Sequence, residues 1–92
     1  MMICKRCFVS GRVQGVFYRE TTRQQAEKNQ LTGYAKNLPD GRVEVVICGS
    51  EKSVDTLVEW LWTGSDYSSV SDVDCKEIEL NEFAQSKTFV TM

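Results

Sequence analysis

The spacing of apolar positions along the chain predicts two helices and several short strands. An apolar stripe at helical spacing predicts a core-facing helix over residues 50–63. Its members are Val54, Leu57, Val58 and Leu61. Another helix is predicted over 18–29, with a thin apolar face formed by Tyr18, Thr22 and Ala26. Runs rich in β-branched and aromatic residues predict strands at 3–9, 32–37, 42–48 and 73–78, with a short last strand at 89–90.

Residues that favour turns and caps separate these elements. The tetrapeptide Leu38-Pro39-Asp40-Gly41 is typical of a hairpin turn between the second and third strands. Ser50 is a suitable N-cap and Gly64 a suitable stop for the later helix. A polar connection is expected over 65–71. Trp60 and Trp62 lie beside the apolar stripe and are expected to pack against the core.

The order of the elements indicates an α+β fold. Strand, helix, strand, strand, helix, strand is the order of the ferredoxin-like split βαβ sandwich, an antiparallel sheet of four to five strands with two helices on one face. The chain has 92 residues, 41% of them hydrophobic, which is enough for one core and too little for two. We therefore expect a single domain over residues 1–92. Many functions use this fold, so function must be argued from a site.

Charge excludes a general nucleic-acid binder, because clustered Lys and Arg hold phosphate backbones and this chain has a net charge of −2. Residues 1–42 nevertheless carry eight Lys or Arg against three Asp or Glu, while residues 43–92 carry three against ten. This asymmetry also fits an ordinary solvated surface. No segment has the roughly 18 apolar residues of a membrane span, and no long apolar block marks a signal peptide. We expect a cytoplasmic protein that does not bind membranes.

The four cysteines predict no metal site. Cys4 and Cys7 form a C-x-x-C, but they lie on a predicted strand, where residues three apart face opposite sides. Cys48 and Cys75 do not form the second pair that a zinc site needs. Buried free thiols are expected. As a second hypothesis, Cys4 and Cys48 lie on strands that neighbour each other in this fold and would cross-link under oxidising conditions.

The segment from Gly11 to Arg19 has the composition of an anion-binding loop. It follows a strand, contains Gly11 and Gly15, and ends at the head of a predicted helix. Glycines allow a tight turn with N–H groups pointing inward, and the helix N-terminus adds its positive end and unpaired amides. Arg19 adds a guanidinium fork suited to a tetrahedral oxyanion. The chain has no histidine, so chemistry at this loop must proceed without the commonest general base and metal ligand.

Two segments resemble the signature segments of the acylphosphatases. They are residues 9–19, Val-Ser-Gly-Arg-Val-Gln-Gly-Val-Phe-Tyr-Arg, and residues 33–37, Gly-Tyr-Ala-Lys-Asn, which are followed by Gly41, Val43 and Gly49. Size and element order also agree, so the resemblance covers essentially the whole chain. Tyr18 departs from the family pattern, which usually has Phe or Met there. A phenol at this position needs a hydrogen-bond partner or a route to water.

The resemblance implies metal-independent hydrolysis of acyl phosphates to carboxylate and inorganic phosphate. It assigns phosphate binding to Arg19 and positioning of the attacking water to Asn37. The cradle that it implies is formed by the backbone amides of Gln14, Gly15, Val16, Phe17, Tyr18 and Arg19. A small acyl phosphate is then the expected substrate, inorganic phosphate or sulfate a product-like ligand, and no cofactor is expected. In isolation, Arg19 would be interpreted as a surface arginine and Asn37 as a cap at a strand end.

Other functions fit the sequence less well. The spacing and lysine of a Walker A loop are absent, as is a dinucleotide-binding G-x-G-x-x-G, which argues against ATP and NAD. A ferredoxin-like RNA binder would carry a strand rich in exposed aromatics. The main alternative is a non-catalytic phosphate- or anion-binding regulatory module that uses the same loop. We expect a monomer.

Overall fold

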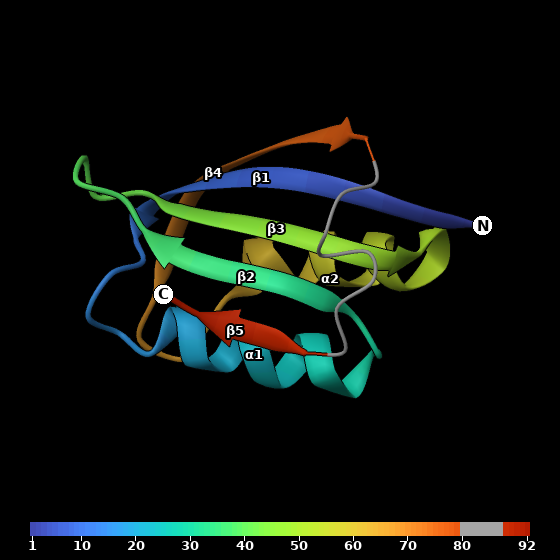
Figure 1. Cartoon of the computed structure of the whole chain (residues 1–92). Coiled ribbons are helices and arrows are strands. Elements are labelled where there is room, and N and C mark those ends of the chain that lie inside the picture. The colour runs from blue at the N-terminus through green and yellow to red at the C-terminus, as the bar shows by residue number, and fades with distance from the viewer. Residues whose placement is uncertain (80–87) are drawn as a thin grey trace.

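The computed structural model describes residues 1–79 and 88–92 and confirms the ferredoxin-like α+β fold (Figure 1). The elements are β1 (Met2–Arg12), α1 (Tyr18–Lys28), β2 (Thr32–Asn37), β3 (Val43–Ser50), α2 (Glu51–Thr63), β4 (Ser69–Ile78) and β5 (Phe89–Thr91). The sheet has the order β4-β1-β3-β2-β5. Neither helix has the length and hydrophobicity of a membrane span.

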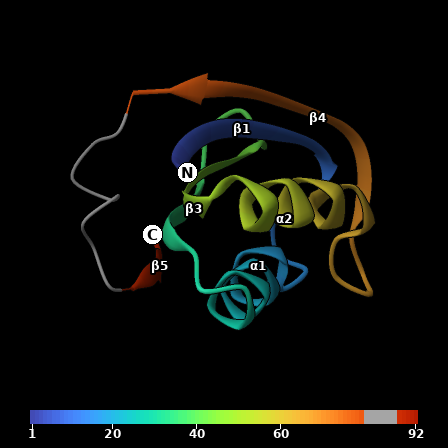
Figure 2. The ribbon, with the colours of Figure 1, turned by 90° about the vertical axis from the view of Figure 1, so that its right-hand side faces the viewer.

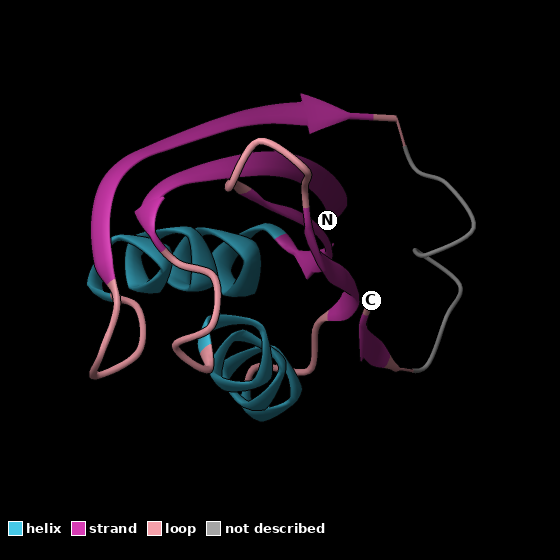
Figure 3. Ribbon diagram, turned by 90° about the vertical axis from the view of Figure 1, so that its left-hand side faces the viewer, coloured by secondary structure: helices cyan, strands magenta, loops and turns pink. Residues whose placement is uncertain are grey.

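Four of the strands pair as predicted, in an antiparallel sheet. β1 pairs antiparallel with both β3 and β4, and β2 pairs antiparallel with β3. The fifth strand differs, because β5 pairs parallel with β2. Views from either side show both helices on the same face of the curved sheet, with β4 arching over α2 (Figures 2 and 3).

The core lies between the helices and the face of the sheet that they cover. The predicted stripe of α2 is buried at Val54, Leu57 and Leu61, while Val58 is half-buried against the core. The thin face of α1 is buried as predicted, at Tyr18, Thr22 and Ala26. Trp60 packs against the core as expected. The prediction is wrong for Trp62, which is 50% exposed because it lies off the stripe.

The caps of α2 follow from its sequence. The Ser50 hydroxyl accepts a hydrogen bond from the backbone N–H of Ser53 (3.3 Å), which satisfies one donor of the first turn. Gly64 ends the helix with a φ of 68°, a left-handed conformation that favours glycine. Both predicted boundaries are therefore confirmed.

The largest differences from the predicted strand bounds are in β1 and β4, while β3 ends two residues and β5 one residue later than predicted. β1 continues past Val9 to Arg12, and β4 begins at Ser69 inside the predicted polar connection. The two extensions pair with each other across an irregularity in register between Ser10 and Gly11. Gly11 has a φ of 118°, and a Cβ there would lie 2.2 Å from the Ser69 carbonyl oxygen. The glycine that indicates a loop in the sequence thus allows two backbones to approach closely inside a sheet.

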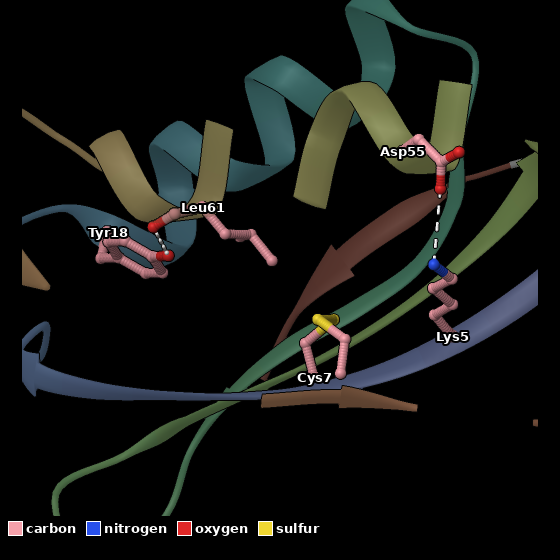
Figure 4. Close-up of a disulfide and its surroundings, with 6 residues drawn as sticks. Lys5, Cys7, Tyr18, Asp55 and Leu61 are labelled. Atoms are coloured by element: carbon pink, nitrogen blue, oxygen red, sulfur yellow. Dashed lines mark hydrogen bonds and ion pairs between the residues drawn. A yellow bond between two sulfur atoms is a disulfide. The ribbon is translucent and has the colours of Figure 1, made fainter. Parts of the chain in front are cut away.

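The cysteines form two disulfides, so the expectation of free thiols is wrong. Cys4 is bonded to Cys48, which confirms the second hypothesis, and Cys7 is bonded to Cys75. Each pair lies directly opposite in the register of the sheet, with Cα atoms 4.1 and 4.0 Å apart. Cys7 belongs to the core under the helices (Figure 4). The two bonds therefore fasten β1 to the strand on each side of it.

Candidate active site

The predicted anion-binding loop is the turn over residues 13–17, between β1 and α1. Gly15 has a φ of 74° and Phe17 a φ of 62°, so two of the five residues have left-handed backbone. A Cβ at Gly15 would meet nothing within 4 Å, so glycine is favoured there by conformation and not by space. Val13 and Val16 are buried and fix the loop to the core. Alternating backbone handedness of this kind turns successive N–H groups toward one side and forms an anion-binding concavity.

The loop and the first turn of α1 present a series of unused backbone donors. In the described part of the chain, none of the backbone N–H groups from Gln14 to Arg19 donates to a protein acceptor. The first hydrogen bond of the helical type runs from the backbone N–H of Thr21 to the Phe17 carbonyl oxygen (3.0 Å). The Thr21 hydroxyl donates to the same oxygen (2.8 Å). The free donors therefore coincide with the positive end of α1, where an anion is stabilised.

Arg19 lies at a cavity of about 280 Å³ that opens beside this loop. The residues that line the cavity are Val13, Gly15, Phe17, Tyr18, Arg19, Glu20 and Thr91. The Arg19 guanidinium donates through Nη1 to the carbonyl oxygen of Met92, just beyond β5. The loops over 13–17, 38–42 and 64–68 lie at the same end of the molecule as the C-terminal residues, on the left-hand side of Figure 1, and Figure 3 faces this end.

Asn37 lies at the end of β2 on the same edge, opposite Val43 of β3. Its Oδ1 is buried and accepts no hydrogen bond from the residues that the structure describes. Asn37 is not among the residues that line the cavity. The Gln14 side chain connects the loop to this strand end, because its amide donates to the carbonyl oxygens of Leu38 and Arg42, each at 2.9 Å. Gln14 thus fastens the loop to the hairpin turn that begins directly after Asn37.

Two carboxylates near the site, those of Glu20 and Asp40, accept hydrogen bonds from arginine side chains. Glu20 lines the cavity, but its side chain accepts hydrogen bonds from Arg23, and these lower the pKa of Glu20. At the hairpin turn, the backbone N–H of Arg42 is the main cause that lowers the pKa of Asp40, and the Arg42 side chain adds to it. Both groups stay ionised and are therefore weak acceptors for a proton.

Hydrogen bonds join the C-terminal end of α2 and the residues after it to the loop and to the start of α1. The buried Ser65 hydroxyl donates to the Val16 carbonyl oxygen (2.7 Å). The Tyr18 hydroxyl donates to the carbonyl oxygen of Leu61 (2.8 Å; Figure 4). The Tyr18 ring stacks on Trp60 with centroids 5.8 Å apart. Tyr18 therefore has the hydrogen-bond partner that a phenol at this position needs. No sequence pattern indicates the supporting roles of Ser65 and Leu61.

Replacing Tyr18 by Phe is expected to lower the free energy of unfolding by about 1–3 kcal/mol, because the Leu61 carbonyl loses a buried donor. Burial raises the pKa of Tyr18 above its usual value of 10.0, so the folded state holds the phenol proton more tightly than the unfolded state does. This contribution is present below pH 10 and is lost as the pH rises further. Urea denaturation should show a gap between wild type and variant at pH 7 that narrows above pH 10. The exposed Tyr67→Phe is the control, and a gap independent of pH would contradict this assignment.

The structure brings some of the sequence-predicted residues together and leaves others apart. Gly15, Phe17, Tyr18 and Arg19 line one cavity, whereas Gln14, Val16 and Asn37 are not among its lining residues. The Gln14 side chain instead donates to the carbonyl oxygen of Leu38, the residue after Asn37. Glu20 and Thr91 also line the cavity, and Met92 holds the guanidinium. Among the described residues, no three His, Cys, Asp or Glu side chains lie close enough together to bind a metal ion.

Known proteins resemble the chain over almost its whole length. The sequence model of the family Acylphosphatase matches residues 5–90. An acylphosphatase of Chromohalobacter salexigens is 53% identical over 83% of this chain and 84% of its own length. The structure of an acylphosphatase from Coxiella burnetii superposes with a TM-score of 0.92 at 44% identity, covering 99% of this chain and 93% of the other. The acylphosphatase from Bacillus subtilis gives a TM-score of 0.92 at 36% identity, covering 100% and 99%. The chain belongs to the acylphosphatase family.

Proposed function

We propose that the chain hydrolyses the carboxyl–phosphate bond of acyl phosphates, with the phosphate held by the backbone amides of residues 14–19 and by Arg19. The observation that carries this proposal is the series of unused N–H donors at the N-terminus of α1, on a loop that lines the same cavity as Arg19. In phosphoryl transfer, negative charge spreads over the equatorial oxygens, so fixed donors and one cation stabilise the transition state. The cavity is near the small end of ligand pockets, roughly 300–1,000 Å³, which suits a small acyl phosphate.

Asn37 is proposed to orient the attacking water. Its buried Oδ1 has no donor among the described residues, and an amide oxygen of this kind accepts a hydrogen bond without titrating. The water attacks phosphorus in line, the bond from phosphorus to the carboxyl oxygen breaks, and that oxygen leaves with the electron pair as part of a carboxylate. A carboxylate is a stable anion at neutral pH, so its departure needs neither a general acid nor a metal.

The proton of the water is assigned to the phosphate oxygens of the substrate. Glu20 and Asp40 are the nearby carboxylates, and their hydrogen bonds to Arg23 and Arg42 lower their pKa values. A group that is reluctant to accept a proton is a poor general base at neutral pH. Glu20→Gln should therefore retain activity.

The alternative of a non-catalytic anion-binding module predicts binding without turnover. Membership of a family whose members are named acylphosphatases favours the hydrolase. Hydrolysis of benzoyl phosphate, followed by absorbance with and without a chelator, separates the two functions. Turnover that survives the chelator supports the proposed hydrolase. Binding of inorganic phosphate with no turnover would support the module.

Replacing Asn37 by Ala is expected to lower kcat by about 10²–10³, the usual cost of removing one transition-state hydrogen bond. Binding of inorganic phosphate should stay unchanged, because Asn37 acts on the water. Asn29→Ala is a matched control at the C-terminal end of α1, where the Asn29 amide donates to Gln25, and it should retain full activity. Equal losses of kcat and phosphate affinity would reassign Asn37 to phosphate binding.

We further propose that residues 1–92 act as a single domain and a monomer in the cytoplasm, with inorganic phosphate or sulfate as a product-like ligand. Size-exclusion chromatography with light scattering tests the monomer. Competition of phosphate and sulfate with benzoyl phosphate tests the ligand.

A further inference from the structure

Phe17 combines two features that do not stabilise the folded chain. Its side chain is 74% exposed, and its backbone has a φ of 62° in the left-handed region. An exposed aromatic ring gains little from the hydrophobic effect, and a left-handed backbone is unfavourable for a bulky side chain. Asparagine or glycine would meet the backbone requirement better. The loop geometry therefore does not explain an aromatic residue at this position.

The position of Phe17 indicates what its ring contacts. Phe17 belongs to the loop whose amides face the anion, and it lines the same cavity as Arg19. Tyr67 is exposed to a similar extent, 73%, yet is not among the residues that line the cavity. Among the residues that line the cavity, Arg19, Glu20 and Thr91 are polar, and the side chains of Val13 and Tyr18 are buried. Phe17 is the large apolar side chain of this lining that is mostly exposed. A substrate with a phosphate at one end and an apolar group at the other matches this division.

We propose that Phe17 is the contact surface for the acyl group, and that the chain prefers acyl phosphates with aromatic or extended apolar acyl groups. The inference rests on the proposed function, because it takes the phosphate to fill the backbone cradle. The acyl group then extends out of the cradle past the loop residues, where the exposed ring is available to stack on it. Stacking and apolar contact would stabilise a benzoyl group and give almost nothing to a methyl group.

The test compares benzoyl phosphate with acetyl phosphate, which share the reacting anhydride and differ in the acyl group. Phe17→Asn removes the ring and keeps a residue that tolerates left-handed backbone. It should lower kcat/KM for benzoyl phosphate about tenfold relative to kcat/KM for acetyl phosphate. Phe17→Tyr should restore the wild-type ratio between the two substrates, and the matched control Tyr67→Asn should leave the ratio as it is.

Two results would overturn the inference while leaving the proposed function intact. One is an equal loss for both substrates in Phe17→Asn, which would show that Phe17 maintains the loop. The other is no loss for either substrate. If the wild-type chain hydrolyses neither substrate, the proposed function fails and the inference falls with it. The ratio between substrates is the informative quantity, because a folding defect lowers both rates together.

Discussion

Replacing Arg19 by Ala is expected to lower kcat/KM for benzoyl phosphate by about 10³–10⁵, the range observed when an arginine that stabilises a transferring phosphoryl group is removed. Arg19 lines the cavity together with residues of the loop whose amides are unused, and its guanidinium donates to the Met92 carbonyl oxygen. Inhibition by inorganic phosphate should also weaken strongly, since the cradle loses its cation. Arg19→Lys should recover only part of the loss, because an ammonium group keeps the charge without the planar fork.

The control for this variant is Arg6→Ala. Lys5 reaches Asp55 of α2, so its neighbour Arg6 faces the opposite side of the sheet, where it pairs with Glu44. Arg6→Ala should retain activity and phosphate inhibition. Retention of both by Arg19→Ala would show that the cradle works without this residue, and the proposed role of Arg19 would be wrong.

Loss of the bond between Cys7 and Cys75 is expected to lower the free energy of unfolding by roughly 4 kcal/mol. The bond closes a loop with a sequence separation of 68, and restricting so long a loop removes much of the entropy of the unfolded chain. The measurement is urea denaturation of the double variant Cys7→Ala/Cys75→Ala beside the oxidised wild type. An effect of this size is large against the total stability of a small domain, about 5–15 kcal/mol.

Reduction of the wild type separates the covalent bond from the packing of the sulfurs. Full reduction breaks both disulfides but removes none of the four cysteine side chains, so the loss of stability reports the two cross-links alone. The Cys4–Cys48 bond has a sequence separation of 44 and should contribute a similar amount to the free energy of unfolding. The difference in stability between the oxidised and the reduced Cys7→Ala/Cys75→Ala variant measures this contribution. Equal stability of oxidised and reduced wild type would contradict the predicted contribution.

Local patterns in the sequence predict the helices and the loop well. The α2 stripe and its caps follow from spacing and residue type, because a helix is determined by neighbours three and four positions apart. The loop is indicated by Gly15 and Arg19, since glycine conformation and guanidinium chemistry are properties of single residues. The family resemblance places Asn37 with them, and the structure adds that its Oδ1 is buried.

Long-range pairing could not be predicted in the same way. The partner of Cys7 depends on the register between β1 and β4, and the sequence of neither strand determines it. β4 is an edge strand with a largely exposed surface, so it lacks the apolar alternation that would mark its start at Ser69. The contacts of Tyr18 with Leu61 and of Arg19 with Met92 also join distant parts of the chain.

The hydrogen bonds that hold the loop have a consequence for how activity appears as the chain folds. Gln14 reaches carbonyls 24 and 28 residues away, and Ser65 reaches back 49 residues to Val16. Contacts of this range form only when separate segments have already come together. An intermediate with both helices in place would still hold residues 13–17 without their curvature. During refolding, turnover of an acyl phosphate would then recover only with the fully native state, whereas helix content would recover earlier.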